Sequence, residues 1–122
     1  MASVTGIDFV ALQVRDLAVS ATFYREQLKL EPAPDSPPNA VVFQTKPIPF
    51  AVRVPAIDLD ASPRLGWGVA LWFQCENADS LCAAMQAQGV PIVQPPSDGP
   101  FGRMFAFADP DGYVITMHGS RG

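Results

Sequence analysis

Residues 7–14 read Ile-Asp-Phe-Val-Ala-Leu-Gln-Val, and they begin the pattern of elements that indicates the fold class. Their β-branched and apolar side chains are typical of a strand, so we expect a strand over 7–14. Asp16 follows, and aspartate is a favoured N-cap because its carboxylate accepts the free N–H groups of the first helical turn. Apolar residues then recur at helical spacing over 17–28, which predicts an amphipathic helix.

The same order of elements is expected twice along the chain. In the first half, two further strands and then a proline-bearing linker are predicted at 40–45, 50–54 and 55–66. In the second half, the predicted elements are a strand over 67–75, a helix from Asn77 or Asp79 to about 88, a short strand near 91–94 followed by a proline-rich loop, and strands over 102–108 and 113–118.

The repeat is visible in the residues as well as in the order, since Ala11-Leu12 recurs as Ala70-Leu71. One such half cannot bury its own sheet face, and its length exceeds that of a solenoid unit. We therefore expect an α+β fold in which two tandem βαβββ modules, about 5–56 and 66–119, form a curved mixed sheet around a cavity, with the helices outside. The linker joins them into one predicted domain over 1–122.

Composition excludes several classes of partner. The chain has 122 residues, 48% of them hydrophobic and 16% charged, with a net charge of -4, so it is expected to be globular and to bind no nucleic acid. No apolar run is long enough to span a membrane, and residues 1–6 show no secretory signal. Cys75 and Cys82 fall in different predicted elements, which favours free thiols in a reducing cytoplasm over a disulfide.

Both ends of the chain resemble one known superfamily. The opening from Ile7 to Leu17, with Ser20 and Phe23-Tyr24, resembles vicinal oxygen chelate proteins, which include glyoxalase I, extradiol dioxygenases and bleomycin-resistance proteins. The ending from Phe101 to Thr116, with its turn Asp109-Pro110-Asp111-Gly112, resembles the closing strand pair of that superfamily. The segment 69–75 is similar to the first strand of its second module.

In metal-dependent members, each module supplies ligands from its first and its last strand. The resemblance places these positions at Phe9, at Thr116, near Gly68 or Ala70, and near Val52 or Arg53. None of these is a usual ligand for a divalent metal, which needs several imidazole, carboxylate or thiolate donors. We therefore expect no metal and no cofactor, as in the bleomycin-resistance-like branch.

Strand alternation predicts which side chains face the cavity. Phe9 shares a face with Gln13, Trp72 with Gln74, and Thr116 with His118, the only histidine. His118 is expected either to act as a cavity acid or base or to lie at the rim near solvent. Phe9 and Trp72 are expected either to line the cavity or to fill it. Arg53 is expected to face either the cavity or the solvated outer side of the sheet. The candidate ligand-binding residues are Phe9, Gln13, Val52, Arg53, Trp72, Gln74, Phe101, Thr116 and His118.

These residues support three hypotheses about function. The leading one is a metal-free protein that sequesters a planar or aromatic small molecule, such as an antibiotic, in an aromatic-lined cavity. The resemblance also implies a homodimer. The alternatives are a glyoxalase- or dioxygenase-like enzyme with an atypical ligand set, and a metal-free enzyme that uses Arg53, Gln13 or His118 for proton transfer. No catalytic residue is assigned.

Overall fold

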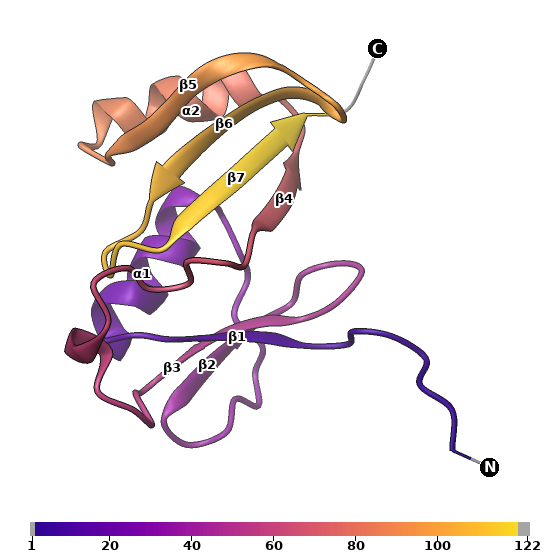
Figure 1. The fold of residues 1–122 in the computed structure, drawn as a ribbon, viewed down its shortest axis with the longest axis vertical. Coiled ribbons are helices and arrows are strands. Elements are labelled where there is room, and N and C mark those ends of the chain that lie inside the picture. Colours follow the sequence, from indigo (N-terminus) through magenta and orange to yellow (C-terminus); the bar gives the residue numbers. More distant parts are fainter. Residues whose placement is uncertain (1, 120–122) are drawn as a thin grey trace. The chain divides into compact units, whose positions relative to one another are not determined.

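The structure is a computed structural model that describes residues 2–119. The chain divides into two compact units, Met1–Ala61 and Ser62–Gly122, and each is described by itself (Figure 1). The boundary between the units lies inside the segment 55–66 that the sequence indicates as a linker. Neither helix in the described part of the chain has the length and hydropathy needed to cross a membrane.

The first unit contains one helix and a three-stranded sheet. Its elements are β1 (Val10–Gln13), α1 (Leu17–Gln27), β2 (Ala40–Phe43), β3 (Phe50–Arg53) and the short 3-10 helix η1 (Leu59–Ala61). The strand order is β1-β3-β2, with β1 parallel to β3 and β2 antiparallel to it. An isolated bridge between Pro32 and Phe43 stands in for the remaining strand of a βαβββ module. Asp16 caps α1 as predicted, since its Oδ1 accepts from the Val19 N–H at 3.2 Å.

Aromatic side chains form the core of the first unit. Tyr24 of α1 is fully buried, and its ring centroid lies 5.0 Å from that of Phe50 on β3. Phe43 on β2 stacks on Phe50 at 6.3 Å and is also fully buried. The helix therefore covers the sheet face that carries Phe43 and Phe50.

The second unit is a complete βαβββ module. Its elements are β4 (Leu71–Cys75), α2 (Ala78–Ala87), β5 (Ile92–Gly99), β6 (Gly102–Ala108) and β7 (Val114–Gly119). The strand order is β4-β7-β6-β5, with β4 parallel to β7 and the other neighbours antiparallel. Asn77 caps α2 through a bond from the Ser80 N–H, and the helix packs against β5, β6 and β7 (Figure 1).

The covered face of this second sheet holds the core of the unit. Phe105, Phe107, Tyr113, Ile115 and Met117 are buried there, together with Met85 and Cys82 of α2. The turn predicted at Asp109-Pro110-Asp111-Gly112 is confirmed. Asp109 Oδ1 accepts from the N–H groups of Asp111 and Tyr113, both at 2.9 Å. Its carboxylate therefore shapes the turn, as expected for a turn-forming residue.

Three strand boundaries differ from the prediction by three residues or more. The first strands of the two units begin at Val10 and Leu71, later than the predicted residues 7 and 67. The predicted short strand near 91–94 runs on to Gly99, through two prolines that were expected in a loop. Register shifts interrupt its pairing with β6 between Ile92 and Ser97. Proline has no N–H to donate, so a bulged strand at the sheet edge can hold both residues.

Candidate functional site

The face of the second sheet opposite α2, hereafter the open face, gathers most of the candidate residues. Side chains alternate from Tyr113 into β7: Tyr113, Ile115 and Met117 are buried, whereas Val114 is 49% exposed. Thr116 and His118 share the side of Val114, as alternation predicts. Pairing extends this face, because Thr116 lies opposite Trp72 and His118 lies opposite Gln74 on the neighbouring strand β4.

An aromatic cluster made of Trp72, Phe101 and His118 stands on the open face. The ring centroids of Trp72 and Phe101 are 5.6 Å apart and edge-to-face, with an interplanar angle of 85°. His118 lies 6.1 Å from Trp72 and 5.7 Å from Phe101. These separations are within the range of favourable ring contacts. Trp72 keeps 39% of its surface exposed and Phe101 57%, so the rings offer contact area to a further molecule.

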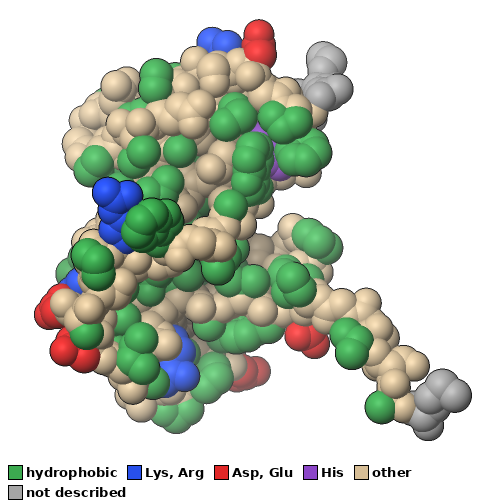
Figure 2. All heavy atoms as spheres, viewed as in Figure 1, with side chains coloured by type: hydrophobic (Ala, Val, Ile, Leu, Met, Phe, Trp, Pro, Cys, Tyr) green, Lys and Arg blue, Asp and Glu red, His purple; other side chains and the backbone are tan. Residues whose placement is uncertain are grey.

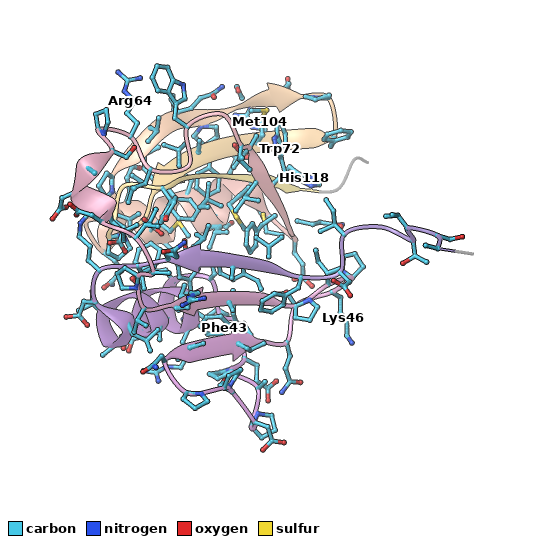
Figure 3. The ribbon with its side chains drawn as sticks, turned by 60° about the horizontal axis from the view of Figure 1, so that its bottom comes forward. Phe43, Lys46, Arg64, Trp72, Met104 and His118 are labelled. Carbon is cyan, nitrogen blue, oxygen red and sulfur yellow. The ribbon has the colours of Figure 1, made fainter. Side chains whose placement is uncertain are left out.

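Polar and soft side chains surround the aromatic cluster. Gln74 and Thr116 supply an amide and a hydroxyl from the neighbouring positions of the ladder. Met104 on β6 pairs with His118, and Figure 3 shows Trp72, Met104 and His118 gathered in one part of the sheet. Among the described strand residues of this unit, no Asp, Glu, Lys or Arg lies on the open face, since Asp98 and Arg103 pair on the other face. The open face is therefore apolar with a few neutral hydrogen-bonding groups.

Met104 was not among the candidates, although the alternation of β6 places it on this face. Gly99 makes room for it, because a Cβ at that position would overlap the Met104 sulfur. Met104 pairs directly with Ser97, and Gly99 is its diagonal neighbour on β5, so a glycine two residues beyond the paired position is the signal for this contact. Methionine adapts its shape readily to aromatic neighbours.

In the first unit, Gln13 and Arg53 pair with each other across β1 and β3. The Gln13 Oε1 accepts hydrogen bonds from the backbone N–H groups of Ala56 at 2.7 Å and Ile57 at 3.2 Å. Gln13 therefore fixes the chain that leaves β3. Arg53 is exposed, and its Nε donates to the Val54 carbonyl at 3.0 Å.

Two first-unit candidates differ in exposure. Phe9 lies just before β1 and is 47% exposed. Val52 differs from the expectation that it lines a cavity, because it is fully buried on the same face as Phe50, the face that α1 covers. Val52 and Arg53 are adjacent on one strand, so they point to opposite faces and cannot both line the same one.

The thiols are poor candidates for a nucleophile. Burial raises the pKa of Cys75, and the backbone N–H of Asn77 opposes this in part. Burial also raises the pKa of Cys82, with the nearby Asp79 carboxylate adding to the effect. Both cysteines are free in the structure. A thiol with a raised pKa stays protonated at neutral pH, and the thiolate is the reactive form.

The donor set does not fit a divalent metal. The positions where the family resemblance places ligands carry a phenyl ring at Phe9 and a hydroxyl at Thr116. Across residues 2–119, His, Cys, Asp and Glu side chains nowhere form a group of three that could hold a metal ion. A structural or catalytic metal needs three or four such donors at one point. These residues therefore do not support a metal-dependent reaction.

Comparison with known proteins establishes the family. A family model described as Glyoxalase/Bleomycin resistance protein/Dioxygenase superfamily matches residues 6–117, so the chain belongs to this superfamily. No curated protein sequence matches the chain.

Solved structures share the fold. A protein from Agrobacterium tumefaciens, solved by solution NMR, is 28% identical over 98% of this chain and 100% of that chain, with a TM-score of 0.74. TnmS3, an antibiotic binding protein from Streptomyces sp. CB03234, is 23% identical over 99% and 100%, with a TM-score of 0.71. A mutant of the fosfomycin resistance protein FosX from Listeria monocytogenes, complexed with Mn(II), is 19% identical over 98% and 93%, with a TM-score of 0.75. Proteins that share this fold thus include one complexed with Mn(II) and one described as antibiotic binding.

Proposed function

We propose that this protein is a metal-free binding protein of the bleomycin-resistance type that sequesters a planar or aromatic small molecule, such as an antibiotic. The observation that carries the proposal is the aromatic cluster on the open face, where Trp72 and Phe101 meet edge-to-face at 5.6 Å and stay partly exposed. Partly exposed rings can take up a flat ligand by stacking, which contributes about 0.5–1.5 kcal/mol beyond burial of area.

The surroundings of the cluster support binding of a neutral ligand. Gln74, Thr116 and His118 provide hydrogen-bonding groups beside the rings, and the strand positions of the open face carry no charge among the described residues. Small-molecule sites typically combine apolar walls with a few such polar groups. The antibiotic-binding description of TnmS3, which shares the fold, agrees with this class of ligand. Ligand-binding roles for Phe9 and Arg53 in the first unit stay predictions.

A titration tests the proposal directly. The chain has two tryptophans, so the variant Trp67→Phe leaves Trp72 as the only indole. Riboflavin, acridine orange and anilinonaphthalene sulfonate are planar probes that differ in charge. At least one of them is expected to change the Trp72 emission saturably, and Trp72→Phe with Trp67 retained is expected to lose the response. A lack of saturable change with all three probes would contradict the proposal.

We further propose that the protein is a cytoplasmic homodimer and that both units belong to one functional domain. Large apolar side chains stay exposed in both units, among them Ile7, Phe9, Trp67, Val69 and Val114. Figure 2 shows hydrophobic side chains on the visible surface of each unit. Extensive exposed apolar surface is a liability that a partner removes. Native mass spectrometry is expected to give a dimer at micromolar concentration, and a spectrum with monomer alone would refute it.

A further inference from the structure

The hairpin between β5 and β6 carries Phe101 to the open face. Gly99 and Gly102 are paired, so the turn consists of Pro100 and Phe101 alone. Gly102 has a φ of +125°, a conformation that L side chains rarely adopt. From this tight turn Phe101 reaches His118 on β7 and Trp72 on β4, the strand at the other edge of the sheet. Phe101 thus extends from the turn to contact Trp72 and His118, the other two members of the aromatic cluster.

Arg103, the residue after Gly102, forms its ion pairs on the opposite face of the sheet, the face that α2 covers. The Arg103 Nε donates to both carboxylate oxygens of Asp79, at 3.3 and 3.2 Å, and Nη1 donates to Asp98 Oδ1 at 3.4 Å. Asp79 lies in the first turn of α2, and this helix packs on β5, β6 and β7. The base of the hairpin is therefore fastened to the helix on one side of the sheet, while its tip contacts Trp72 on the other.

We infer that Arg103 is a positioning residue that holds Phe101 against Trp72 and His118 by anchoring the base of the β5–β6 hairpin to Asp79. The inference rests on the proposed function in that it treats Phe101 as part of the ligand surface. Arg103 itself lies on the face opposite the ligand surface and acts only through the hairpin. The single Nε–H of Arg103 is shared between the two oxygens of the Asp79 carboxylate, and this charge-assisted contact directs the guanidinium toward the first turn of α2.

The test measures how far Phe101 shields the Trp72 indole from solvent, and it needs no ligand. All variants carry Trp67→Phe, and acrylamide quenching then reports the accessibility of the Trp72 indole. Phe101→Ala is expected to raise the quenching constant, because one ring neighbour is lost. Arg103→Gln and Asp79→Ala are each expected to raise it toward the same level. Arg103→Gln added to Phe101→Ala is expected to raise it no further, since residues that act through one contact are not additive.

Two matched controls separate this anchor from a general loss of charge. Asp98→Asn removes the longer contact to the same guanidinium, from a carboxylate that is 96% exposed, and is expected to leave quenching near the parent value. Arg15→Gln removes an aspartate-paired arginine of the first unit and is expected to do the same. Circular dichroism spectra that match the parent protein show that the variants are folded.

The inference is overturned if Arg103→Gln and Asp79→Ala, both folded, leave quenching unchanged, or if the double variant exceeds Phe101→Ala alone. Probe binding is a separate readout. If quenching rises as expected while no planar probe binds, the anchor stands and the proposed function fails. If probes bind and quenching does not rise, the proposed function stands and the anchor fails.

Discussion

Trp72 on β4 and Thr116 on β7 are direct partners in a parallel ladder, so an indole stands beside a hydroxyl on the open face. Thr116 is also the position where the family resemblance places the last-strand metal ligand. A threonine hydroxyl is a weak donor to divalent metals, and its neighbours across the ladders are Trp72 and Ala106. The expected position of a metal ligand is therefore replaced in this chain by part of an apolar contact surface.

Metal analysis should reflect this replacement. Protein purified without chelator is expected to contain zinc, nickel, iron and manganese far below one equivalent, because the described residues offer no group of three donors. Treatment with EDTA is expected to leave both the melting temperature and probe binding unchanged, since no folding or binding energy depends on a metal. Stoichiometric metal by mass spectrometry, together with destabilisation by EDTA, would favour the enzyme hypothesis over sequestration.

Removal of the indole on the open face should weaken ligand binding. Trp72→Ala is expected to lower the affinity for a planar probe by about 1–3 kcal/mol, the contribution of burying a large side chain. Isothermal titration calorimetry measures this loss without relying on tryptophan emission. Trp67→Ala is the matched control, because Trp67 is 77% exposed and contacts Arg64 outside the open face. An equal loss in both variants would mean that the probe does not use the aromatic cluster.

Phe101, in the turn before β6, and Phe105, within β6, should differ sharply in their effect on stability. Phe105 is fully buried beside Phe107, so Phe105→Ala is expected to lower the free energy of unfolding by about 3–5 kcal/mol through lost burial and a cavity. Phe101 is 57% exposed, and Phe101→Ala is expected to cost about 0.5 kcal/mol, as for most surface changes. Urea denaturation measures both. Comparable losses would indicate that Phe101 belongs to the core.

Much of the second unit could be predicted from local pattern. Period-two alternation placed Ile115 and Met117 on one face and Thr116 and His118 on the other, and burial confirms this assignment. The turn at Asp109 was predicted from its own four residues. Such features depend on residues close in sequence, and their periodicity leaves one solution once a single face is buried.

Features that depend on distant residues were missed or ambiguous. Which of Val52 and Arg53 shares a face with Gln13 depends on the register of β1 with β3, and no local pattern fixes that register. The contact of Phe101 with Trp72 spans the sheet from a hairpin to the edge strand. The ion pairs of Arg103 likewise join a hairpin to a helix. In each case tertiary placement decides which neighbour a side chain meets, and propensity carries no information on it.

The close contact between residue 66 and the Tyr113 ring gives a further prediction. A Cβ at Gly66 would lie 2.9 Å from Tyr113 Cδ1, and Gly66 has a φ of +72°. Gly89 has a similar φ of +81°, but a Cβ there would meet nothing within 4 Å. Gly89→Ala is therefore expected to cost only the left-handed strain, roughly 1–2 kcal/mol. Gly66→Ala is expected to cost about 1–3 kcal/mol more, because the ring must move.

Urea denaturation of the two glycine variants measures the difference, and Tyr113→Ala identifies its cause. With the ring removed, the added cost of Gly66→Ala should fall to that of Gly89→Ala, since the strain remains and the steric conflict does not. Tyr113 is 9% exposed and bounds the core of the second unit, and its ring occupies the space that a side chain at residue 66 would need. An unchanged cost in the Tyr113→Ala background would show that backbone strain alone requires glycine at this position.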